Sequence, residues 1–168
     1  MQDTRIDGPE LIARLKLQPH PEGGYFREVY RGDALVRRDG SEETHSASTA
    51  IYFLLCDGAY SSWHRIRSDE LWHFYAGDPI HVHVIDAKGA LTTLKLGNAL
   101  LHDDAVFQAA VKAENWFVAE CIDPSGIALV GCTVASGFEF SEFEFADSAA
   151  LETLYPQHRE FISRLAPR

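Results

Sequence analysis

A histidine and a glutamate six residues apart are the side chains whose spacing points most directly to chemistry. His64 follows Gly58 by six residues, Glu70 follows His64 by six, and Gly77 follows Glu70 by seven. An imidazole changes its charge near neutral pH, and a carboxylate beside it can orient the ring or accept a proton itself. The pair His64 and Glu70 therefore predicts a site of general acid–base catalysis.

Two β-strands joined by a tight hairpin would position this pair. Alternate side chains of a strand point to the same face, so His64 shares a face with Ser62 and Ile66. On the return strand Glu70 shares a face with the aromatic residues that follow at even spacing. We expect both faces to point into a barrel, with Ser62 and Ile66 contacting a bound substrate.

Aromatic residues supply candidates for the wall of that site. Trp72, Phe74 and Trp116 are of the type that fills a core, and inside a small barrel they also form an apolar surface for a flat ligand. We expect them to contact substrate. A proton donor opposite His64 would come from a tyrosine; we assign Tyr52 as this acid and Tyr25 to substrate binding, although strand alternation leaves open whether these or Tyr75 point inward.

Histidine is unusually frequent and clustered. The chain has eight histidines, and four of them lie within twenty residues, namely His64, His73, His81 and His83. Such a cluster invites a metal site. His73 has the opposite parity from Glu70, so it is expected to face away from the site. No acidic residue follows His81 and His83 at a suitable spacing, and we interpret them as solvated strand histidines. His20, in a loop rich in proline and glycine, is interpreted as closing a turn.

The rest of the sequence predicts an all-β architecture with a helix at each end. Asp7 to Leu15 reads as a short helix with Pro9 in its first turn, and Ala149 to Leu165 reads as a helix broken near Pro156. Short segments rich in aromatic and β-branched residues lie between them. The expected strands are residues 25–31, 48–55, 61–67, 71–76, 80–85, 91–96, 107–111, 116–122, 128–134 and 138–145.

Five blocks in a fixed order resemble a known family. They are Leu17 to Glu28 (LQPHPEGGYFRE), Ser48 to Leu55 (STAIYFLL), Trp63 to Arg65 (WHR), Asp69 to Pro79 (DELWHFYAGDP), and Leu129 to Val134 (LVGCTV) with Gly137 to Phe140 (GFEF). Together they resemble the cupin superfamily, and within it the largely uncharacterised small cupins of the type 5 domain. The resemblance implies a double-stranded β-helix, or jelly roll, close to the dTDP-sugar 3,5-epimerases, and often a homodimer. It implies no settled reaction.

Departures from the metal-binding cupin pattern argue against a tightly held metal. Ile66 stands where such cupins have a second histidine, and Phe117 stands where the later motif supplies another. Catalytic metals generally need three protein ligands. We therefore predict no metal or other cofactor. The less favoured alternative is a divalent metal, which His64 and Glu70 would hold. Type 5 members also commonly carry Pro-Ala-Gly where this chain has Lys112, Ala113 and Glu114.

Composition limits the partners. A formal charge of −10 disfavours nucleic acid and anionic membranes. The N-terminal sequence MQDTRIDGPE contains no apolar leader segment, and no run approaches the length of a membrane span. Cys56, Cys121 and Cys132 form no metal or disulfide pattern and are expected to fill apolar space. These features predict a cytoplasmic protein.

These observations converge on one cupin domain spanning residues 1–168, with a small molecule as its partner. The favoured function is metal-independent isomerisation or epimerisation of a sugar-like or polar metabolite by His64, Glu70 and Tyr52. A metal-dependent oxygenase or lyase and a non-catalytic binding module remain alternatives.

Overall fold

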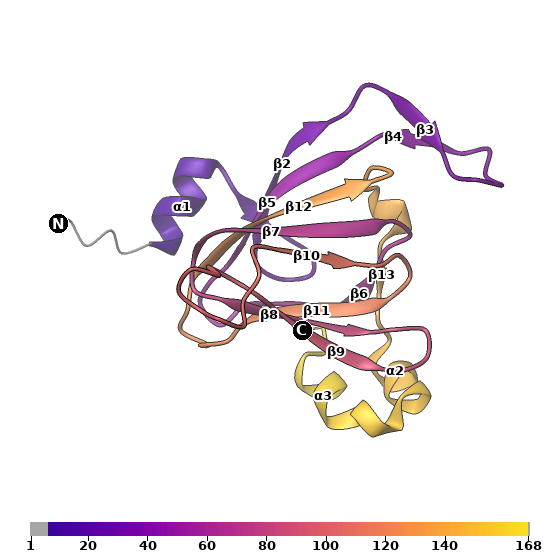
Figure 1. Cartoon of the computed structure of the whole chain (residues 1–168). Helices are drawn as coiled ribbons and strands as arrows, with labels where there is room; N and C mark the ends of the chain where they lie inside the picture. Colours follow the sequence, from indigo (N-terminus) through magenta and orange to yellow (C-terminus); the bar gives the residue numbers. More distant parts are fainter. Residues whose placement is uncertain (1–6, 168) are drawn as a thin grey trace.

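The chain folds into two facing antiparallel sheets (Figure 1). The computed structural model describes residues 7–167; residues 1–6, where the sequence shows no apolar leader, and residue 168 lie outside that range. The first sheet has the order β1 (Gln18–Pro19), β2 (Tyr25–Arg31), β5 (Thr49–Leu55), β12 (Ala128–Ala135), β7 (Asp69–Gly77) and β10 (Gln108–Val111). The second has the order β13 (Glu144–Phe145), β6 (Tyr60–Arg65), β11 (Trp116–Cys121), β8 (Ile80–Ile85) and β9 (Leu91–Leu96). This is the predicted jelly roll.

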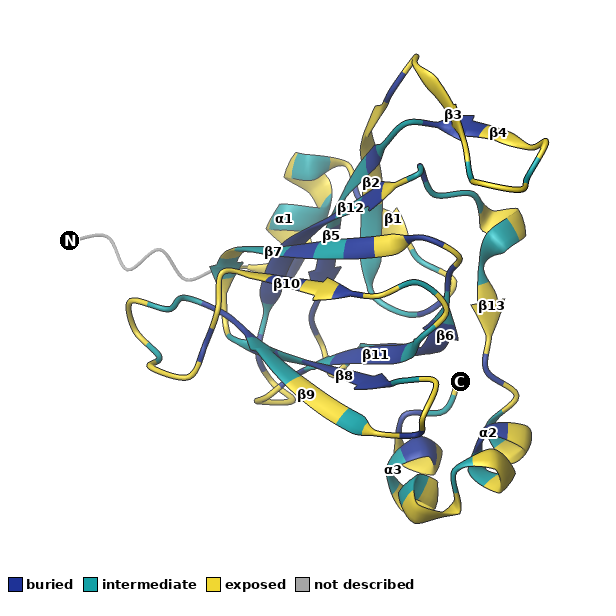
Figure 2. Cartoon of the chain, turned by 45° about the vertical axis from the view of Figure 1, so that its right-hand side comes forward, coloured by how far each residue is buried: buried dark blue, intermediate teal, exposed yellow. Residues whose placement is uncertain are grey.

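The core lies between the sheets because inward-facing side chains alternate along every long strand. Phe53, Trp72 and Phe117 are almost completely buried at its centre. Figure 2 shows the buried stretches of β6, β11 and β12 in the two facing sheets. The bounds of β2, β8 and β9 equal those expected from composition and alternation.

Helices cover the outer face of each sheet. α1 (Gly8–Leu15) packs its apolar positions on the outside of the first sheet, around Leu54 and Leu129. At the other end α2 (Ser148–Leu154), the 3₁₀ turn η2 (Pro156–His158) and α3 (Arg159–Arg164) cover the second sheet, where Trp63 is fully buried. The predicted break near Pro156 is confirmed. Within residues 7–167 no helix is long and apolar enough to cross a membrane.

Two strand expectations need correction. β6 and β7 do not form a hairpin: β6 pairs with β11 and β13, whereas β7 pairs with β10 and β12 in the opposite sheet. The short connection between them therefore crosses from one sheet to the other. As a consequence, His64 and Glu70 approach each other across the interior rather than side by side along a ladder.

The segment 138–145 is also not one strand. It contains the 3₁₀ turn η1 (Phe140–Glu142) followed by β13. A regular strand would send Phe138 and Phe140 to one face and Phe143 to the other. The turn instead gathers all three rings, with centroids 4.9 Å apart for Phe138 and Phe140 and 6.3 Å for Phe138 and Phe143.

A projecting two-stranded arm was not expected from the sequence. β3 (Leu35–Arg37) pairs with β4 (Thr44–Ser46) and extends from the end of β2 beyond the sheets (Figure 1). Its outer residues are exposed, Leu35 at 68%. Because these strands are three residues long and alternate poorly, their sequence carries little periodic signal.

The histidines on β7 and β8 differ in their surroundings. His73 faces away from the interior, as predicted, and its Nε2 lies 2.9 Å from Thr133 Oγ1. The prediction for His83 is wrong, because its side chain is buried between Thr93 Oγ1 at 2.8 Å and Glu120 Oε1 at 3.1 Å. Phe161 of α3 packs against the His83 ring, with centroids 4.6 Å apart, and Arg164 of the same helix binds the same glutamate.

Candidate active site

A small cavity lies between the two sheets, at the end nearest the arm. Its volume is about 70 Å³. The acids, histidines and other polar or reactive residues that line it are His20, Glu22, Glu28, Arg31, Thr49, His64, Glu70, Cys132 and Glu139. Its apolar lining residues are Phe26, Ile51, Ile66, Val134, Phe138, Phe140 and Phe143. Because water-sized spheres need about 10–15 Å³ each, the cavity holds only a few non-hydrogen atoms of a ligand.

His64 lies on β6 with its imidazole almost entirely buried, at 2% exposure. The ring is stacked on Phe143 with centroids 5.0 Å apart, and it contacts Phe117 at 4.1 Å. Nδ1 lies 2.7 Å from the carbonyl oxygen of Ser62, to which it donates. This bond fixes the ring and leaves Nε2 for a second partner.

That partner is Glu22, which the sequence analysis did not select. Glu22 Oε2 lies 3.0 Å from His64 Nε2, and the glutamate is only 8% exposed. The carboxylate comes from the loop between β1 and β2, far from His64 in the sequence. The sequence feature that could have identified Glu22 is its place between Pro21 and Gly23, because a turn rich in proline and glycine fixes the backbone there.

Glycine and serine hold this loop in place. Gly23 has a φ of +110°, and a Cβ atom there would lie 2.1 Å from the carbonyl oxygen of Tyr60. Ser62 donates to the carbonyl oxygen of Glu22 twice, from its backbone N at 2.9 Å and from Oγ at 3.0 Å. Ser62, predicted to touch substrate, thus positions the Glu22 backbone, and it borders a separate outer depression rather than the cavity.

Mutual attraction sets the charges of Glu22 and His64. Burial alone would raise the pKa of Glu22, but the attraction of His64, reinforced by their hydrogen bond and by His20, lowers it. Burial alone would lower the pKa of His64, but the attraction and hydrogen bond of Glu22 raise it. Both shifts favour the carboxylate–imidazolium form of this pair, whose Oε2 and Nε2 atoms lie 3.0 Å apart.

Glu70 experiences the opposite balance. It is 9% exposed on β7, and burial, with a contribution from the negative charge of Glu22, raises its pKa to about 7. His64 and a hydrogen bond from the Cys132 thiol lower the pKa of Glu70 but do not cancel the effect of burial. The predicted convergence of His64 and Glu70 on one cavity is thus present, and Glu70 exchanges a proton near neutral pH.

Cys132 is buried, as expected, but it borders the cavity. Burial raises its pKa well above the usual value, and Glu70 and Glu22 add to this effect. The sulfur is therefore a neutral thiol that donates to Glu70, which is unfavourable for a nucleophile.

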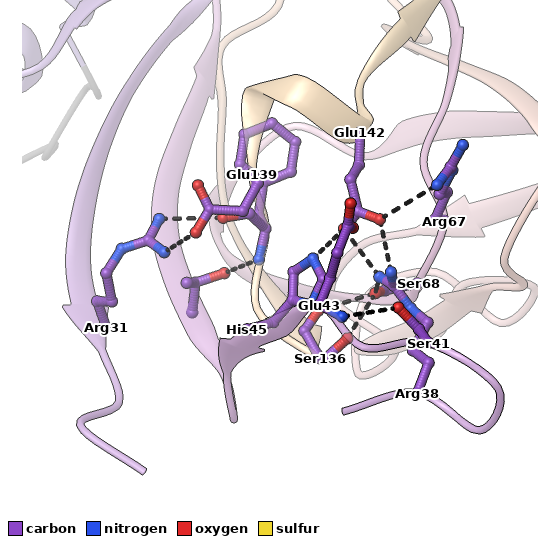
Figure 3. A network of polar contacts seen from close by, with 12 residues as sticks. Arg31, Arg38, Ser41, Glu43, His45, Arg67, Ser68, Ser136, Glu139 and Glu142 are labelled. Atoms are coloured by element: carbon purple, nitrogen blue, oxygen red, sulfur yellow. Dashed lines mark hydrogen bonds and ion pairs between the residues drawn. The ribbon is translucent and has the colours of Figure 1, made fainter. Parts of the chain in front are cut away.

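Charged residues form the exposed side of the cavity lining, among them Arg31 and Glu139, whose contact Figure 3 shows. Arg31 donates from Nε and Nη2 to Glu28 at 2.8 and 2.9 Å, and from Nη1 to Glu139 at 2.8 Å. Its Nη2 also donates to the carbonyl oxygen of Phe138 at 3.0 Å. These bonds tie the aromatic segment before η1 to β2.

A second polar network holds the same segment from its far side. The carboxylate of Glu142 accepts hydrogen bonds from both terminal nitrogens of Arg38, and its Oε1 lies 3.0 Å from His45 Nε2 (Figure 3). Arg67 lies 4.0 Å from Glu142 Oε2. The position of the phenylalanine wall therefore depends on side chains from the arm.

Several residues predicted to contact substrate lie away from the cavity. Tyr25 and Tyr52 point to the outer face of the first sheet, where they pack in the cluster under α1. Trp116 packs in the cluster under the C-terminal helices, with the guanidinium of Arg65 4.5 Å above its ring. Arg65 also donates to Glu144 at 2.8 Å, in the ion-pair role that its strand parity indicates.

The remaining candidates lie inside the barrel. Ile66 lines the cavity together with His64 and Glu70. Trp72 is 1% exposed and Phe74 is partly buried, and both pack in the core beyond the cavity rather than lining it. The structure thus brings together His64, Glu70 and Ile66, and adds Glu22 and His20.

Comparison with known proteins agrees with this geometry. A family model described as "Cupin superfamily (DUF985)", named Cupin_5, matches residues 9–146. The chain belongs to the Cupin_5 family. No curated protein matches this cupin.

Solved structures show the same fold. A hypothetical protein from Leishmania major is 34% identical to this cupin, with a TM-score of 0.86 over 95% of this chain and 98% of that one. A protein from Shewanella oneidensis is also 34% identical, with a TM-score of 0.86 over 96% and 98% of the chains. A variant of oxalate decarboxylase from Bacillus subtilis is 17% identical, with a TM-score of 0.54 over 89% of this chain and 37% of that one. This last similarity shows the fold alone.

The donor groups of the cavity do not form a metal cage. Among residues 7–167, Glu43, His45 and Glu142 form the group whose three ligand atoms lie within 4.8 Å of one another, and it lies at the base of the arm. Both carboxylate oxygens of Glu142 in this group already accept hydrogen bonds from Arg38. In the cavity, Nε2 of His64 faces Glu22, and Phe117 packs against the ring. We therefore derive no step through a metal.

The turn before β11 is left-handed although it lacks the glycine that the family resemblance implies there. Glu114 has a φ of +64°. Its backbone N donates to the carbonyl oxygen of Ile66 at 2.9 Å. The left-handed conformation thus forms without glycine, at an energetic cost of about 1 kcal/mol.

Proposed function

We propose that this cupin is an acid–base enzyme that isomerises a small polar metabolite, with Glu70 and His64 as its proton-transferring groups. The observation that carries the proposal is the meeting of two buried titratable groups on one cavity. Burial raises the pKa of Glu70 to about 7, and the neighbouring Glu22 raises the pKa of His64. Titratable groups with perturbed pKa values that meet in one cavity are typical of acid–base sites.

The charge states assign the roles. Glu70 in its carboxylate form takes a proton from the carbon next to a carbonyl group, and the electron pair of that C–H bond forms a C=C bond. The imidazolium of His64 gives its Nε2 proton, which it otherwise directs to Glu22, to the carbonyl oxygen, so an enol forms with no net change in charge. Return of the proton from Glu70 to the neighbouring carbon, and of a hydroxyl proton to His64, completes an isomerisation.

Glu22, rather than Glu70 as the sequence suggested, is the carboxylate that orients His64. It stabilises the imidazolium form of His64 at 3.0 Å and fixes its orientation. In the described structure the Tyr52 ring packs against Tyr75 outside the barrel, with ring centroids 6.1 Å apart. We therefore propose Glu70 and His64, rather than His64 and Tyr52, as the opposing pair.

The cavity volume limits the substrate. A space of about 70 Å³ accommodates the reacting end of a metabolite, and the rest of a larger molecule would extend past Arg31 to the mouth. This supports a small hydroxy-carbonyl compound, or one end of a sugar.

Solvent deuterium tests the reaction without knowledge of the substrate. Mixtures of hydroxy-carbonyl metabolites are incubated with the protein in D₂O, and the products are analysed by mass spectrometry. We expect wild type to add one deuterium to a compound that Glu70→Gln and His64→Gln leave unlabelled, because the proton held by Glu70 exchanges with solvent.

Glu10→Gln on α1 is the matched control, since it removes one exposed carboxylate. Binding without labelling in any mixture would contradict the enzyme proposal and favour a non-catalytic binding module. Labelling abolished by a chelator would favour the metal-dependent alternative.

We also propose that the protein acts as a cytoplasmic homodimer without nucleic-acid or membrane partners. The net charge of −10 supports the exclusion of polyanionic partners. Exposed apolar residues on β2 and the arm, Val29, Tyr30 and Leu35, support a second copy as the partner.

A further inference from the structure

Arg31, the cation at the exposed end of the cavity, already has hydrogen-bond partners within the protein. The guanidinium of Arg31 makes two hydrogen bonds to Glu28. It makes one more to Glu139 and one to the carbonyl oxygen of Phe138 (Figure 3). A bidentate pair with one carboxylate already uses the geometry by which arginine recognises an anionic substrate. An incoming carboxylate or phosphate would have to displace Glu28 or Glu139, both of which are themselves negatively charged.

The interior has no spare positive charge either. The imidazolium of His64 faces Glu22 at 3.0 Å. Burial lowers the pKa of His20 and so disfavours its charged form, although Glu22 opposes the effect. Its Nδ1 accepts from the backbone N of Glu22 at 3.1 Å. Among the lining residues that the structure describes, each cation thus has a carboxylate partner.

Negative charge, in contrast, is in excess. Four carboxyl groups line the cavity, those of Glu22, Glu28, Glu70 and Glu139, against the two cations Arg31 and His64. An anion that left water to enter this space would lose its hydration without gaining a counterion. Among the acids lining the described cavity, Glu70 is buried and makes no ion pair, so a ligand cation would supply the partner that it lacks.

The apolar walls favour the same sign of charge. Phe26, Phe138, Phe140 and Phe143 line the cavity. The faces of aromatic rings carry negative electrostatic potential and attract cations, with about 0.5–2 kcal/mol per contact. Anions gain nothing comparable from them.

We propose that the cavity selects small ligands without negative charge, and that an amine binds more tightly than its neutral isostere because Glu70 receives its ammonium group. This specifies the substrate class of the proposed acid–base site and rests on that function. It excludes sugar nucleotides and keto acids and points to amino alcohols, amino sugars and neutral hydroxy-carbonyl compounds.

Three probes with the same carbon skeleton test the selection: 1-amino-2-propanol as cation, lactamide as neutral molecule and lactate as anion. Each is titrated at pH 7.5 while the ¹⁵N resonances of the His64 ring are followed. We expect the Kd to rise by about tenfold from amine to amide and again by about tenfold from amide to lactate. Lactate binding as tightly as lactamide, or no response to any probe, would overturn the proposal.

Variants separate the charge effect from simple fit. Glu70→Gln should reduce amine affinity to that of the amide. The double variant Glu28→Gln and Glu139→Gln, which exposes the Arg31 guanidinium, should bind lactate about tenfold more tightly than wild type. Glu160→Gln, an exposed carboxylate on α3, is the control and should change neither value. Unchanged affinities in the cavity variants would also overturn the proposal.

The two proposals fail independently. Deuterium labelling of an anionic metabolite by wild type would refute the ligand class but keep the acid–base function. Amine selection without labelling of any compound would keep the ligand class and leave a binding protein.

Discussion

At the scale of single residues, one ion-pair partner explains why two buried groups on the same cavity titrate differently. Burial opposes charge on both His64 and Glu70, but only His64 has a carboxylate at 3.0 Å to compensate. Glu22 therefore determines the chemistry of the site although it contributes no proton to the substrate. Sequence spacing identified His64 and Glu70 because they are local, whereas Glu22 reaches them only through the fold.

Replacing Glu22 should expose this dependence. In Glu22→Gln we expect the pKa of His64 to fall, because burial then acts without its opposing ion pair. An NMR titration of the ring resonances measures the change. Glu10→Gln, on the exposed side of α1, should leave the pKa of His64 as in wild type. A His64 pKa that stayed raised in Glu22→Gln would show that another group holds the charge.

Glu70 should make stability depend on pH. Its pKa is about 7 in the folded chain and about 4.5 when unfolded, so the folded state binds the proton more tightly. The contribution of Glu70 is fully present below pH 4.5 and is lost as pH rises through 7. Relative to wild type, Glu70→Gln should therefore become more stable between pH 5 and 8, by up to about 3 kcal/mol.

Urea unfolding at several pH values measures this difference. Glu10→Gln serves again as the control, with a difference from wild type that stays constant over the same range. A constant difference for Glu70→Gln as well would mean that Glu70 titrates normally.

At the scale of elements, alternation predicts the strands well and their connections poorly. β8 and β9 were predictable because apolar and β-branched residues run between clear turn signals. The arm and η1 were not, since three-residue strands and a single 3₁₀ turn leave no periodic pattern. Nor does alternation reveal which sheet a strand joins, which is why β6 and β7 were expected to form a hairpin.

The loop between β1 and β2 is the element on which the site depends most. Gly23→Ala should destabilise the fold by about 2–3 kcal/mol, because its positive φ disfavours alanine and its Cβ would collide with the Tyr60 carbonyl. Displacement of this loop should also lower the pKa of His64. Gly40→Ala is the matched control: its φ is +77°, but nothing lies within 4 Å of the added Cβ, so we expect a loss of about 1 kcal/mol.

Denaturant unfolding and the His64 titration together check both effects. Equal losses of stability in the two alanine variants, with an unchanged His64 pKa, would mean that the loop does not depend on close contact at Gly23.

At the scale of the whole molecule, the two sheets of the jelly roll enclose the cavity, which opens beside the arm. The sheets bury His64. The phenylalanine wall is held by β2, through the bond of Arg31 to Glu139, and by the arm, through the bonds of Arg38 to Glu142. The family resemblance predicted this fold correctly, because the blocks that carry it coincide with β2, β5 and β7 and with the loop before β2. The fold does not by itself define a reaction.

The proposed dimer belongs to this scale. We expect light scattering at micromolar concentration to give twice the chain mass of 18.8 kDa. Tyr30→Lys together with Leu35→Lys should shift the mass toward one chain, because charge replaces exposed apolar surface on β2 and β3. Lysine at Leu101, an exposed apolar residue away from the arm, should not. A mass of 18.8 kDa for wild type would contradict the dimer.

The most direct test of acid–base function at this cavity is an NMR titration of wild type that follows the side-chain carboxyl carbon of Glu70 and the ring of His64 together. We predict that Glu70 takes up its proton near pH 7 while His64 is still an imidazolium. A Glu70 carboxyl that stays ionised down to pH 5, together with a His64 ring that is neutral at pH 7, would contradict it.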